Sequence, residues 1–297
     1  MRCNPVKIIR MSGDLVGMTF LATGFQQSDQ DTSGTLIACL DAIRSHPFFR
    51  LVKEESFDLL QVTEGMRLLE IGCGTGADAW KLAGMTGRSG LVAAIDPSLV
   101  MLKSAQDGTC TGQKSDSAPL RPAFMRMDGR DLAFFDSVFD CVREDRALQH
   151  IMAPERVISE MLRVLKPDGA FILFEPDWEL FTIDAPDRLI TRKILNFWSD
   201  QFMNGWIGRE LFRICMDCGA IMVSAYPRTM VLHDLEFCEQ IFGIMETVNR
   251  TVHAGIITSE EAAAWLSSIS DADRAGKFFC SFTGYLVKGR KKRSSSD

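Results

Sequence analysis

The sequence predicts an α/β protein built on a doubly wound, mostly parallel sheet with helices on both faces. Apolar runs and helical patterns alternate from about residue 66 to residue 175, as in a chain of βαβ units. The first apolar run ends in Gly72, Gly74 and Gly76, and a helix start follows at Ala77. Glycine suits positions where the backbone takes positive φ or where a ligand lies against the main chain. The turn therefore predicts a nucleotide-like ligand at the carboxyl end of a buried strand.

The expected elements follow in a regular order along the chain. Ser33 is suited to cap a helix over 34–45, and Pro47 is suited to open one over 48–61. The polar segment 107–119, rich in Ser, Thr and Gly, is interpreted as a loop. The expected strands cover residues 66–71, 91–95, 122–127, 138–143, 170–175, 221–232 and 278–287. The expected helices cover residues 76–85, 98–106, 154–165, 184–203, 207–218, 234–253 and 259–269.

Composition limits the classes of function. The 297 residues carry a formal net charge of −6, which argues against a general nucleic-acid binder, because such proteins are normally basic. No apolar run approaches the length of a membrane span. Nine cysteines are scattered through expected strands and helices, which suits buried thiols in a reducing compartment. We therefore expect a cytoplasmic protein whose partner is a small molecule.

Three acids lie at or just after the ends of apolar runs, and they narrow the choice of ligand. Glu70 lies two residues before the first glycine, Asp96 closes the run 91–95, and Asp128 follows the run near 124–127. A pyrophosphate would gain nothing from these carboxylates. S-adenosylmethionine carries a sulfonium and an ammonium and no phosphate, so carboxylates suit it.

At these positions the chain resembles the class I S-adenosylmethionine-dependent methyltransferases. Leu-Glu-Ile-Gly-Cys-Gly-Thr-Gly at 69–76 is similar to the first motif of that family, and Ala-Ala-Ile-Asp-Pro-Ser at 93–98 is similar to the second. Further similar segments lie at 127–130, 139–151 and 161–170, where Asp168 departs from the usual Pro-Gly-Gly. The branch that it resembles is the small-molecule, methyltransferase type 11-like branch of quinone and natural-product pathways.

The resemblance implies a fold and a cofactor site. The sheet would have seven strands, with an antiparallel last strand beside strand six. The glycines would approach the methionine part of S-adenosylmethionine, Asp96 would accept from the ribose hydroxyls, and Asp128 would accept from the adenine amine. The expected cofactor residues are Glu70, Gly72, Cys73, Gly74, Gly76, Asp96, Pro97, Asp128, Gly129 and Glu144.

Two alternatives remain open. Gly72-x-Gly74-x-x-Ala77 also fits the dinucleotide pattern, and Asp96 lies about 20 residues further on. An NAD(P)-dependent oxidoreductase is therefore one alternative, although no basic residue beside the glycine turn favours it. A non-catalytic module that binds S-adenosylmethionine and acts as a partner or sensor is the other.

Sequence outside the motifs predicts a lid. An antiparallel last strand begins at the ligand-binding face, so the long connection before it must lie there. We expect a helical cap over residues 1–60, then a methyltransferase domain over 61–297 with lid insertions at about 176–218 and 233–277. The basic segment 289–297 is expected to be a disordered tail. Four tryptophans lie after residue 177, which predicts an apolar or aromatic acceptor, and the amino-terminal helices could pack across a homodimer.

Residues that act on the acceptor are harder to predict, because methyl transfer from a sulfonium needs mainly alignment. His150 and Glu175 are the catalytic candidates, since both follow strands that end at the expected site. Arg146, Trp178 and Arg209 are the candidates for substrate binding. The Cys-x-x-Cys pair at 215–218 has no second pair of metal-ligand spacing, so we expect packing there and no metal site.

Overall fold

The computed structural model describes residues 33–108 and 121–293. In this part of the chain seven strands form one sheet in the order β3-β2-β1-β4-β5-β7-β6. The pairs from β3 to β5 are parallel, and β7 runs antiparallel to both of its neighbours. The predicted doubly wound sheet with an antiparallel last strand is confirmed. The strands are β1 (Arg67–Ile71), β2 (Leu91–Asp96), β3 (Ala123–Arg126), β4 (Phe139–Asp145), β5 (Leu165–Ile183), β6 (Ala220–Leu232) and β7 (Cys280–Lys291).

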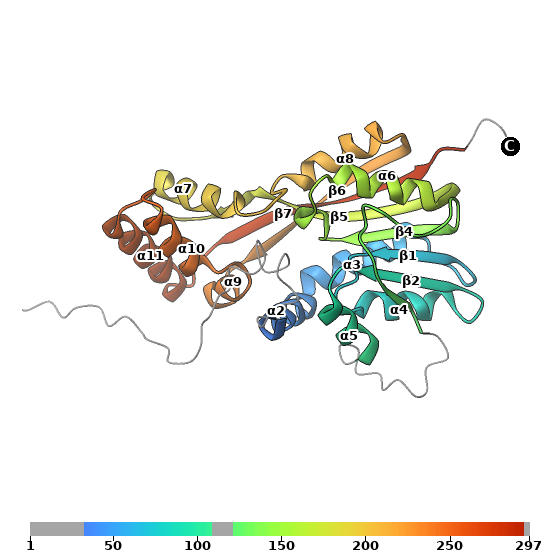
Figure 1. Cartoon of the computed structure of the whole chain (residues 1–297). Coiled ribbons are helices and arrows are strands. Elements are labelled where there is room, and N and C mark those ends of the chain that lie inside the picture. The colour runs from blue at the N-terminus through green and yellow to red at the C-terminus, as the bar shows by residue number, and fades with distance from the viewer. Residues whose placement is uncertain (1–32, 109–120, 294–297) are drawn as a thin grey trace, which may run out of the picture.

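Helices cover both faces of the parallel part of the sheet (Figure 1). Successive residues of β1 point to opposite faces, so Leu68 packs under α3 and α4, whereas Leu69 packs under α6 and α8. Because both faces are covered, the strand is an almost continuous apolar run. The helices on this part are α3 (Pro47–Leu60), α4 (Ala77–Thr86), α5 (Leu99–Asp107), α6 (Pro154–Val164) and α8 (Ile207–Asp217), with the short 3-10 helix η3 (Leu148–His150) after β4.

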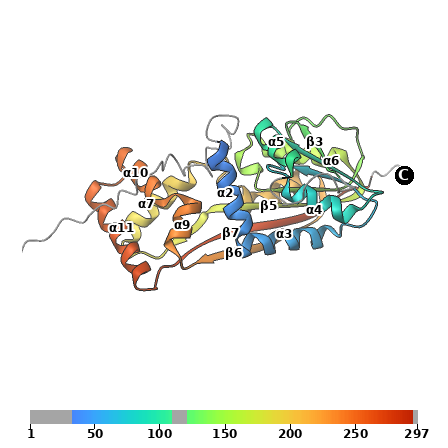
Figure 2. The same ribbon diagram turned by 90° about the horizontal axis from the view of Figure 1, so that it is seen from below.

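Strands β5, β6 and β7 continue beyond the parallel part of the sheet, and four helices pack around their far ends (Figures 1 and 2). We call these helices the cap; they are α7 (Arg188–Ser199), α9 (Leu235–Phe242), α10 (Ile244–His253) and α11 (Ser259–Arg274). Helix α2 (Ser33–Ser45) lies between the cap and the parallel strands and packs against α3 and α9.

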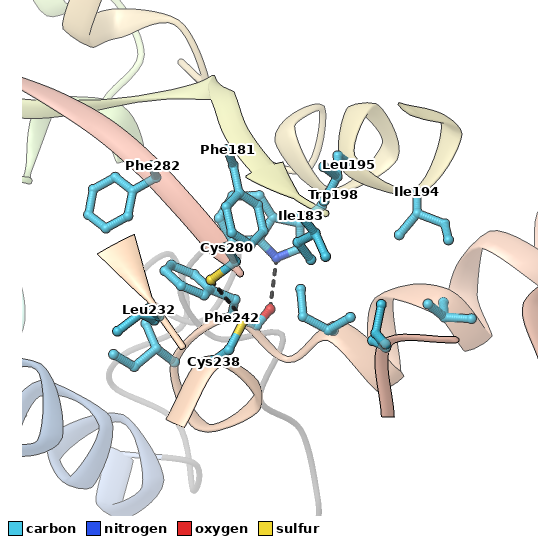
Figure 3. Packing of buried hydrophobic residues seen from close by; sticks show 14 of the residues in the cluster. Phe181, Ile183, Ile194, Leu195, Trp198, Leu232, Cys238, Phe242, Cys280 and Phe282 are labelled. Carbon is cyan, nitrogen blue, oxygen red and sulfur yellow. Dashed lines mark hydrogen bonds between the residues drawn. The ribbon is translucent and has the colours of Figure 1, made fainter. Parts of the chain in front are cut away.

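The cap has an aromatic core of its own (Figure 3). Trp198 donates a hydrogen bond from Nε1 to the carbonyl oxygen of Phe242 at 2.8 Å. Phe181 of β5 and Phe282 of β7 belong to the same core. The parts of these strands that extend beyond the parallel sheet therefore pack against the cap helices. Strands β5 and β7 thus contribute side chains to three hydrophobic cores, one on each face of the parallel sheet and one in the cap.

Several predicted boundaries are wrong. Strand β5 does not end at residue 175 but runs to Ile183, because β7 pairs with it out to Cys280. The Glu-Pro-Asp stretch at 175–177 has the composition of a turn. In the structure Asp177 is fully buried and ion-paired with Arg209, which lets the strand continue.

The remaining differences concern the lid and the tail. Residues 289–291 belong to β7, and the Lys291 ammonium donates to the Leu165 carbonyl at 2.7 Å, so the predicted tail begins too early. Residues 294–297, like 1–32, lie outside the described residues. The helix expected over 234–253 is two helices, because Gly243 takes φ 59° between them. Helix α8, placed in the lid by the predicted bounds 176–218, covers the sheet instead. None of the described helices is long and apolar enough to cross a membrane.

Candidate active site

A cavity of about 610 Å³ lies at the carboxyl ends of β1, β2 and β4. That volume falls within the range of small-molecule sites. One side, which we call the strand-end wall, consists of residues 70–75, 95–98 and 127–130. The opposite side, which we call the cap-side wall, comes from α2, α3, the loop after β4, and the cap. The cap-side wall contains Leu40, Ile43, Phe49, residues 149–152, Trp178, Met203, Ile241 and Phe242.

The turn after β1 contains three glycines, and the structure shows why each position suits glycine. Gly72, Gly74 and Gly76 take φ values of 71°, 51° and 77°. A Cβ on Gly72 would lie 2.5 Å from the Cβ of Ala147, and one on Gly76 would lie 2.7 Å from the Cβ of Ala105. A Cβ on Gly74 would meet nothing within 4 Å, so its backbone faces open space. The turn needs glycine for packing at two positions and leaves bare backbone toward the cavity at the third.

Asp96 holds the turn in place. Its Oδ2 accepts from the Gly74 N–H at 2.9 Å, and its Oδ1 accepts from the Ser98 N–H at 2.9 Å. Each carboxylate oxygen has two lone pairs, so one oxygen can accept more than one hydrogen bond. Cys73 and Pro97 line the cavity beside it, and burial raises the pKa of the Cys73 thiol well above its usual value.

Asp128 and Gly129 close the strand-end wall after β3. The Arg130 guanidinium lies 2.6 Å from Oδ2 of Asp128, and this hydrogen bond lowers the pKa of the carboxyl. Asp128 is partly exposed. A charged carboxylate paired with Arg130 therefore stands at the rim of the cavity.

The sequence analysis missed a buried group of charges between the two walls. Arg143 of β4 is 1% exposed and lies 2.7 Å from Glu70, 2.8 Å from Asp145 and 3.1 Å from Asp78. Lys53 of α3 bonds both Asp78 and Asp145, the latter at 2.9 Å. These residues come from four segments, so no local motif predicts them. The one available signal was a run of four charged residues, Arg143 to Arg146, at the end of an apolar strand.

Glu70 is a buried carboxyl on the strand-end wall. Burial raises the pKa of its carboxyl to about 8, and Arg143 opposes that shift without cancelling it. Oε1 accepts from Arg143, whereas Oε2 is buried and accepts no hydrogen bond within the described residues. A ligand ammonium would provide the missing donor and favour the charged carboxylate. The wall thus fits a cationic ligand.

The loop after β4 presents two side chains to the cavity. Arg146 takes φ 62°, and its guanidinium lies 4.8 Å from the centre of the Phe49 ring and 2.7 Å from Asp145. His150 lines the cavity, and burial, with a smaller contribution from Arg146, lowers the pKa of its imidazole to about 3. His150 is therefore neutral near pH 7 and a weak base.

The structure does not bring Glu144, Glu175 or Arg209 to the cavity. Glu144 accepts from the Leu148 N–H at 3.3 Å, and Glu175 accepts from the Gln149 N–H at 3.2 Å, so both carboxyls support the loop from behind. Burial raises the pKa of Glu144 to about 7 and that of Glu175 well above its usual value. These two side chains fix the loop that carries the cavity residues.

The remaining substrate candidates differ in position. Arg209 bonds Asp177 at 2.7 Å and Glu179 at 2.6 Å outside the cavity. Trp178 lines the cavity and donates from Nε1 to the Gln149 side chain at 2.7 Å. Among residues 33–108 and 121–293, no three His, Cys, Asp or Glu side chains gather as a metal site.

Comparison with known proteins gives a consistent set of relatives. Residues 69–173 match the family described as "Methyltransferase domain". An uncharacterized 37.1 kDa protein in transposon TN4556 of Streptomyces fradiae is 32% identical over 252 residues, which cover 84% of this chain and 70% of that protein. The ubiquinone/menaquinone biosynthesis C-methyltransferase UbiE of Pseudomonas fluorescens is 30% identical over 164 residues, 55% of this chain and 60% of UbiE. The chain thus spans about three fifths of the length of that curated enzyme.

Solved structures share the fold at low identity. Phosphoethanolamine N-methyltransferase 2 of Haemonchus contortus, in complex with S-adenosyl-L-methionine, gives a TM-score of 0.57 at 16% identity, covering 91% of this chain and 60% of that one. The [4+2]-cyclase SpnF gives a TM-score of 0.56 at 18% identity, covering 91% and 96%.

Proposed function

From the premise that the chain belongs to the class I S-adenosylmethionine-dependent methyltransferases, we propose that it methylates O, N or C of a small, largely apolar or aromatic acceptor. The predicted enzyme class and the predicted cofactor, S-adenosylmethionine, are confirmed by that membership. The choice of acceptor is our proposal. It rests on one observation: a single cavity has a polar strand-end wall and an apolar cap-side wall.

The strand-end wall offers a complementary group for each part of the cofactor. Oε2 of Glu70 is placed to accept from the ammonium group, and the bare backbone at Gly74 leaves room for the methionine part. Asp96 has lone pairs for two ribose hydroxyls. Asp128, with the backbone of Gly129, is suited to the adenine amine.

The chain's own contribution to the reaction is alignment and exclusion of water. When bound, S-adenosylmethionine supplies a methyl group whose new bond uses an acceptor electron pair, while the electrons of the broken carbon–sulfur bond stay on sulfur. Correct alignment can lower such a barrier by several kcal/mol, or about 7–11 kcal/mol at the limit. His150, with a pKa of about 3, is better suited to orient the acceptor through a hydrogen bond than to remove its proton.

The cap-side wall supports the acceptor class. Ile43, Phe49, Trp178 and Phe242 present aliphatic and aromatic surface to the space beyond the glycine turn. Relatives named for ubiquinone and menaquinone biosynthesis are compatible with an aromatic acceptor, although they match just over half of this chain. The net charge of −6 supports a small molecule over a nucleic acid. Free thiols at Cys141, Cys215 and other described cysteines support a cytoplasmic location.

Binding and turnover test the proposal separately. Calorimetry of the full chain should show binding of S-adenosylmethionine and its demethylated product but no binding of NADH. Incubation with isotopically labelled methyl donor and a panel of apolar phenols, amines and enols should then label at least one of them. Because a [4+2]-cyclase shares this fold, each acceptor is also incubated without the donor. One outcome would contradict methyl transfer: the protein binds the donor and labels no acceptor, yet it converts an acceptor to another product when the donor is absent.

A further inference from the structure

The charges between the two walls do not balance near neutral pH. Lys53, Arg143 and Arg146 are positive, and Asp78 and Asp145 are negative. The sixth residue of the group, Glu70, is largely protonated below pH 8 because its carboxyl is buried. An ammonium beside Glu70 would restore the carboxylate but would add its own charge. One positive charge therefore remains without a counter-ion in either case.

Arg146 is a cation with donors to spare. Asp145 shares its carboxylate among three cations: Oδ1 accepts from Arg146, whereas Oδ2 faces Lys53 and Arg143. Arg146 uses only Nε in that contact. Within the described residues its two terminal nitrogens have no hydrogen-bond partner. Two N–H-bearing nitrogens thus stay available on a guanidinium that lines the cavity.

The position of that guanidinium is fixed on the cap side. It lies over the ring of Phe49, which belongs to the cap-side wall, and Asp145 holds it from the other direction. The backbone of Arg146 takes the left-handed conformation, φ 62°, and its N–H donates to the Phe174 carbonyl at 2.8 Å. Non-glycine residues adopt that conformation where surrounding structure enforces it, and such sites are often functional. Arg44 of α2 and Lys53 of α3 also line the cavity from this side, and both are positive.

We propose that the methyl acceptor carries an acidic oxygen (a phenol, an enol or a carboxylic acid) that binds the Arg146 guanidinium as an anion. This inference rests on the proposed function and specifies its substrate class. A planar guanidinium with two free N–H groups matches an oxygen anion in geometry and charge. The anion would also separate Arg146 from the cationic donor, so bound donor and bound acceptor should strengthen each other.

The same arrangement explains why neither His150 nor Glu175 has to act as a strong base. His150 is too weak a base, and Glu175 lies behind the loop. An acceptor that ionises against Arg146 releases its proton to water, so no side chain has to remove it during the reaction. Arg146 is in this account a substrate-binding residue.

Matched neutral and anionic probes test the proposal on the full chain saturated with S-adenosylhomocysteine. Calorimetry compares naphthoate with naphthamide, which has a similar shape and no charge. We expect naphthoate to bind at least about tenfold more tightly, a charge-assisted preference. Para-nitrophenol gives a second readout, since its anion absorbs visible light. Its pKa should fall by about one unit on binding.

Three variants assign the effect. Arg146→Met should abolish the preference for naphthoate and the shift of the nitrophenol, while S-adenosylhomocysteine still binds. Arg146→Lys keeps the charge without the paired donors and should retain part of both effects. Arg192→Met, an exposed arginine of α7, should behave as the wild type.

The proposal is overturned if naphthamide binds as well as naphthoate, if neither probe binds, or if Arg146→Met keeps the preference. If Arg146→Met does not fold, two other measurements test the proposal: the ratio of wild-type affinities for naphthoate and naphthamide, and the same ratio for Arg146→Lys. Loss of S-adenosylhomocysteine binding by the wild type would contradict the proposed function instead, and that titration comes first.

Discussion

The two walls of the cavity are built in opposite ways. The strand-end wall comes from three short segments at the ends of neighbouring parallel strands, and its contacts are backbone N–H groups and carboxylates. The cap-side wall draws on α2, α3, the loop after β4, β5 and α9, and its contacts are mostly apolar side chains. The first wall is therefore specified by local turn geometry and the second by long-range packing. Cofactor affinity and acceptor affinity should respond to different mutations.

The largest expected effect is on the cap core. Trp198 is 5% exposed and packs among Trp178, Phe181 and Phe242. We expect Trp198→Ala to lower the free energy of unfolding by about 3–5 kcal/mol, through lost burial and a cavity. Where the variant is folded, turnover of the acceptor should be lost, but affinity for S-adenosylhomocysteine should change by less than about threefold.

Thermal unfolding and calorimetry measure the two quantities for Trp198→Ala. Trp206→Ala is the control, because Trp206 is half-exposed and should cost less than about 1 kcal/mol. A large loss of cofactor affinity in Trp198→Ala would show that the two walls are not separable.

The next effect concerns the glycine turn. In Gly72→Ala the new Cβ would meet Ala147 at 2.5 Å in a backbone with φ 71°. We expect affinity for S-adenosylhomocysteine to fall by about 10- to 100-fold, or about 1.4–2.8 kcal/mol. Gly84→Ala, in α4 with nothing within 4 Å, should instead stabilise the fold by about 0.5–1 kcal/mol. If the two variants bound the cofactor equally well, close packing against Ala147 would not explain why residue 72 is glycine.

A smaller effect is the pH dependence of donor binding. The pKa of Glu70 is raised to about 8, mainly by burial, so the carboxyl is protonated in the free protein near neutral pH. The donor's cationic groups favour the carboxylate, so binding should release a proton. Affinity for S-adenosylmethionine should rise with pH, by up to about tenfold per unit, and level off above about pH 8.

Glu70 also links stability to pH. Between its usual value of 4.5 and about 8 the folded carboxyl binds the proton more tightly than the unfolded one. The free energy of unfolding of the ligand-free protein should therefore fall as pH rises through this window. Glu70→Gln should flatten both profiles, in calorimetry and in denaturant titrations. If that variant kept the wild-type slope of donor affinity, another group would be responsible.

The smallest effect lies where the two walls meet. Trp178 donates from its indole N–H to Gln149, whose own side-chain amide donates to the Arg146 carbonyl at 2.9 Å. Trp178→Phe should cost about 1 kcal/mol in stability, leave S-adenosylhomocysteine binding unchanged, and slow turnover a few-fold by loosening the loop. Steady-state kinetics test this. If Trp178→Phe instead changed cofactor affinity and left turnover normal, Trp178 would act on the strand-end wall and not on the loop.

The difference between the walls also explains how far the sequence could be interpreted. Glycines and acids at fixed spacing predict the strand-end wall, because a tight turn restricts both its backbone and its neighbours. Ile43 and Ile241 meet at the cavity although about 200 residues separate them, and no local pattern reports that contact.

Charged residues show the same limit. Lys53, Asp78 and Arg143 each look like ordinary charged positions of a helix or strand end, and only their meeting in space makes a buried network. Likewise, nothing near Glu175 predicts that β5 continues, because the cause lies in β7 about 100 residues away. Glu175 itself is predicted near the site and lies one layer behind it.

The position of β7 has a consequence for how a ribosome makes this protein. Strand β7 is synthesised after the other six described strands, yet it lies between β5 and β6, and in the described sheet β6 bonds to no other strand. Strands β1 to β5 can therefore assemble while translation continues, whereas β6 waits with both edges exposed until its partner emerges. The nascent chain should acquire its affinity for the donor before β7 emerges and its acceptor pocket only afterwards.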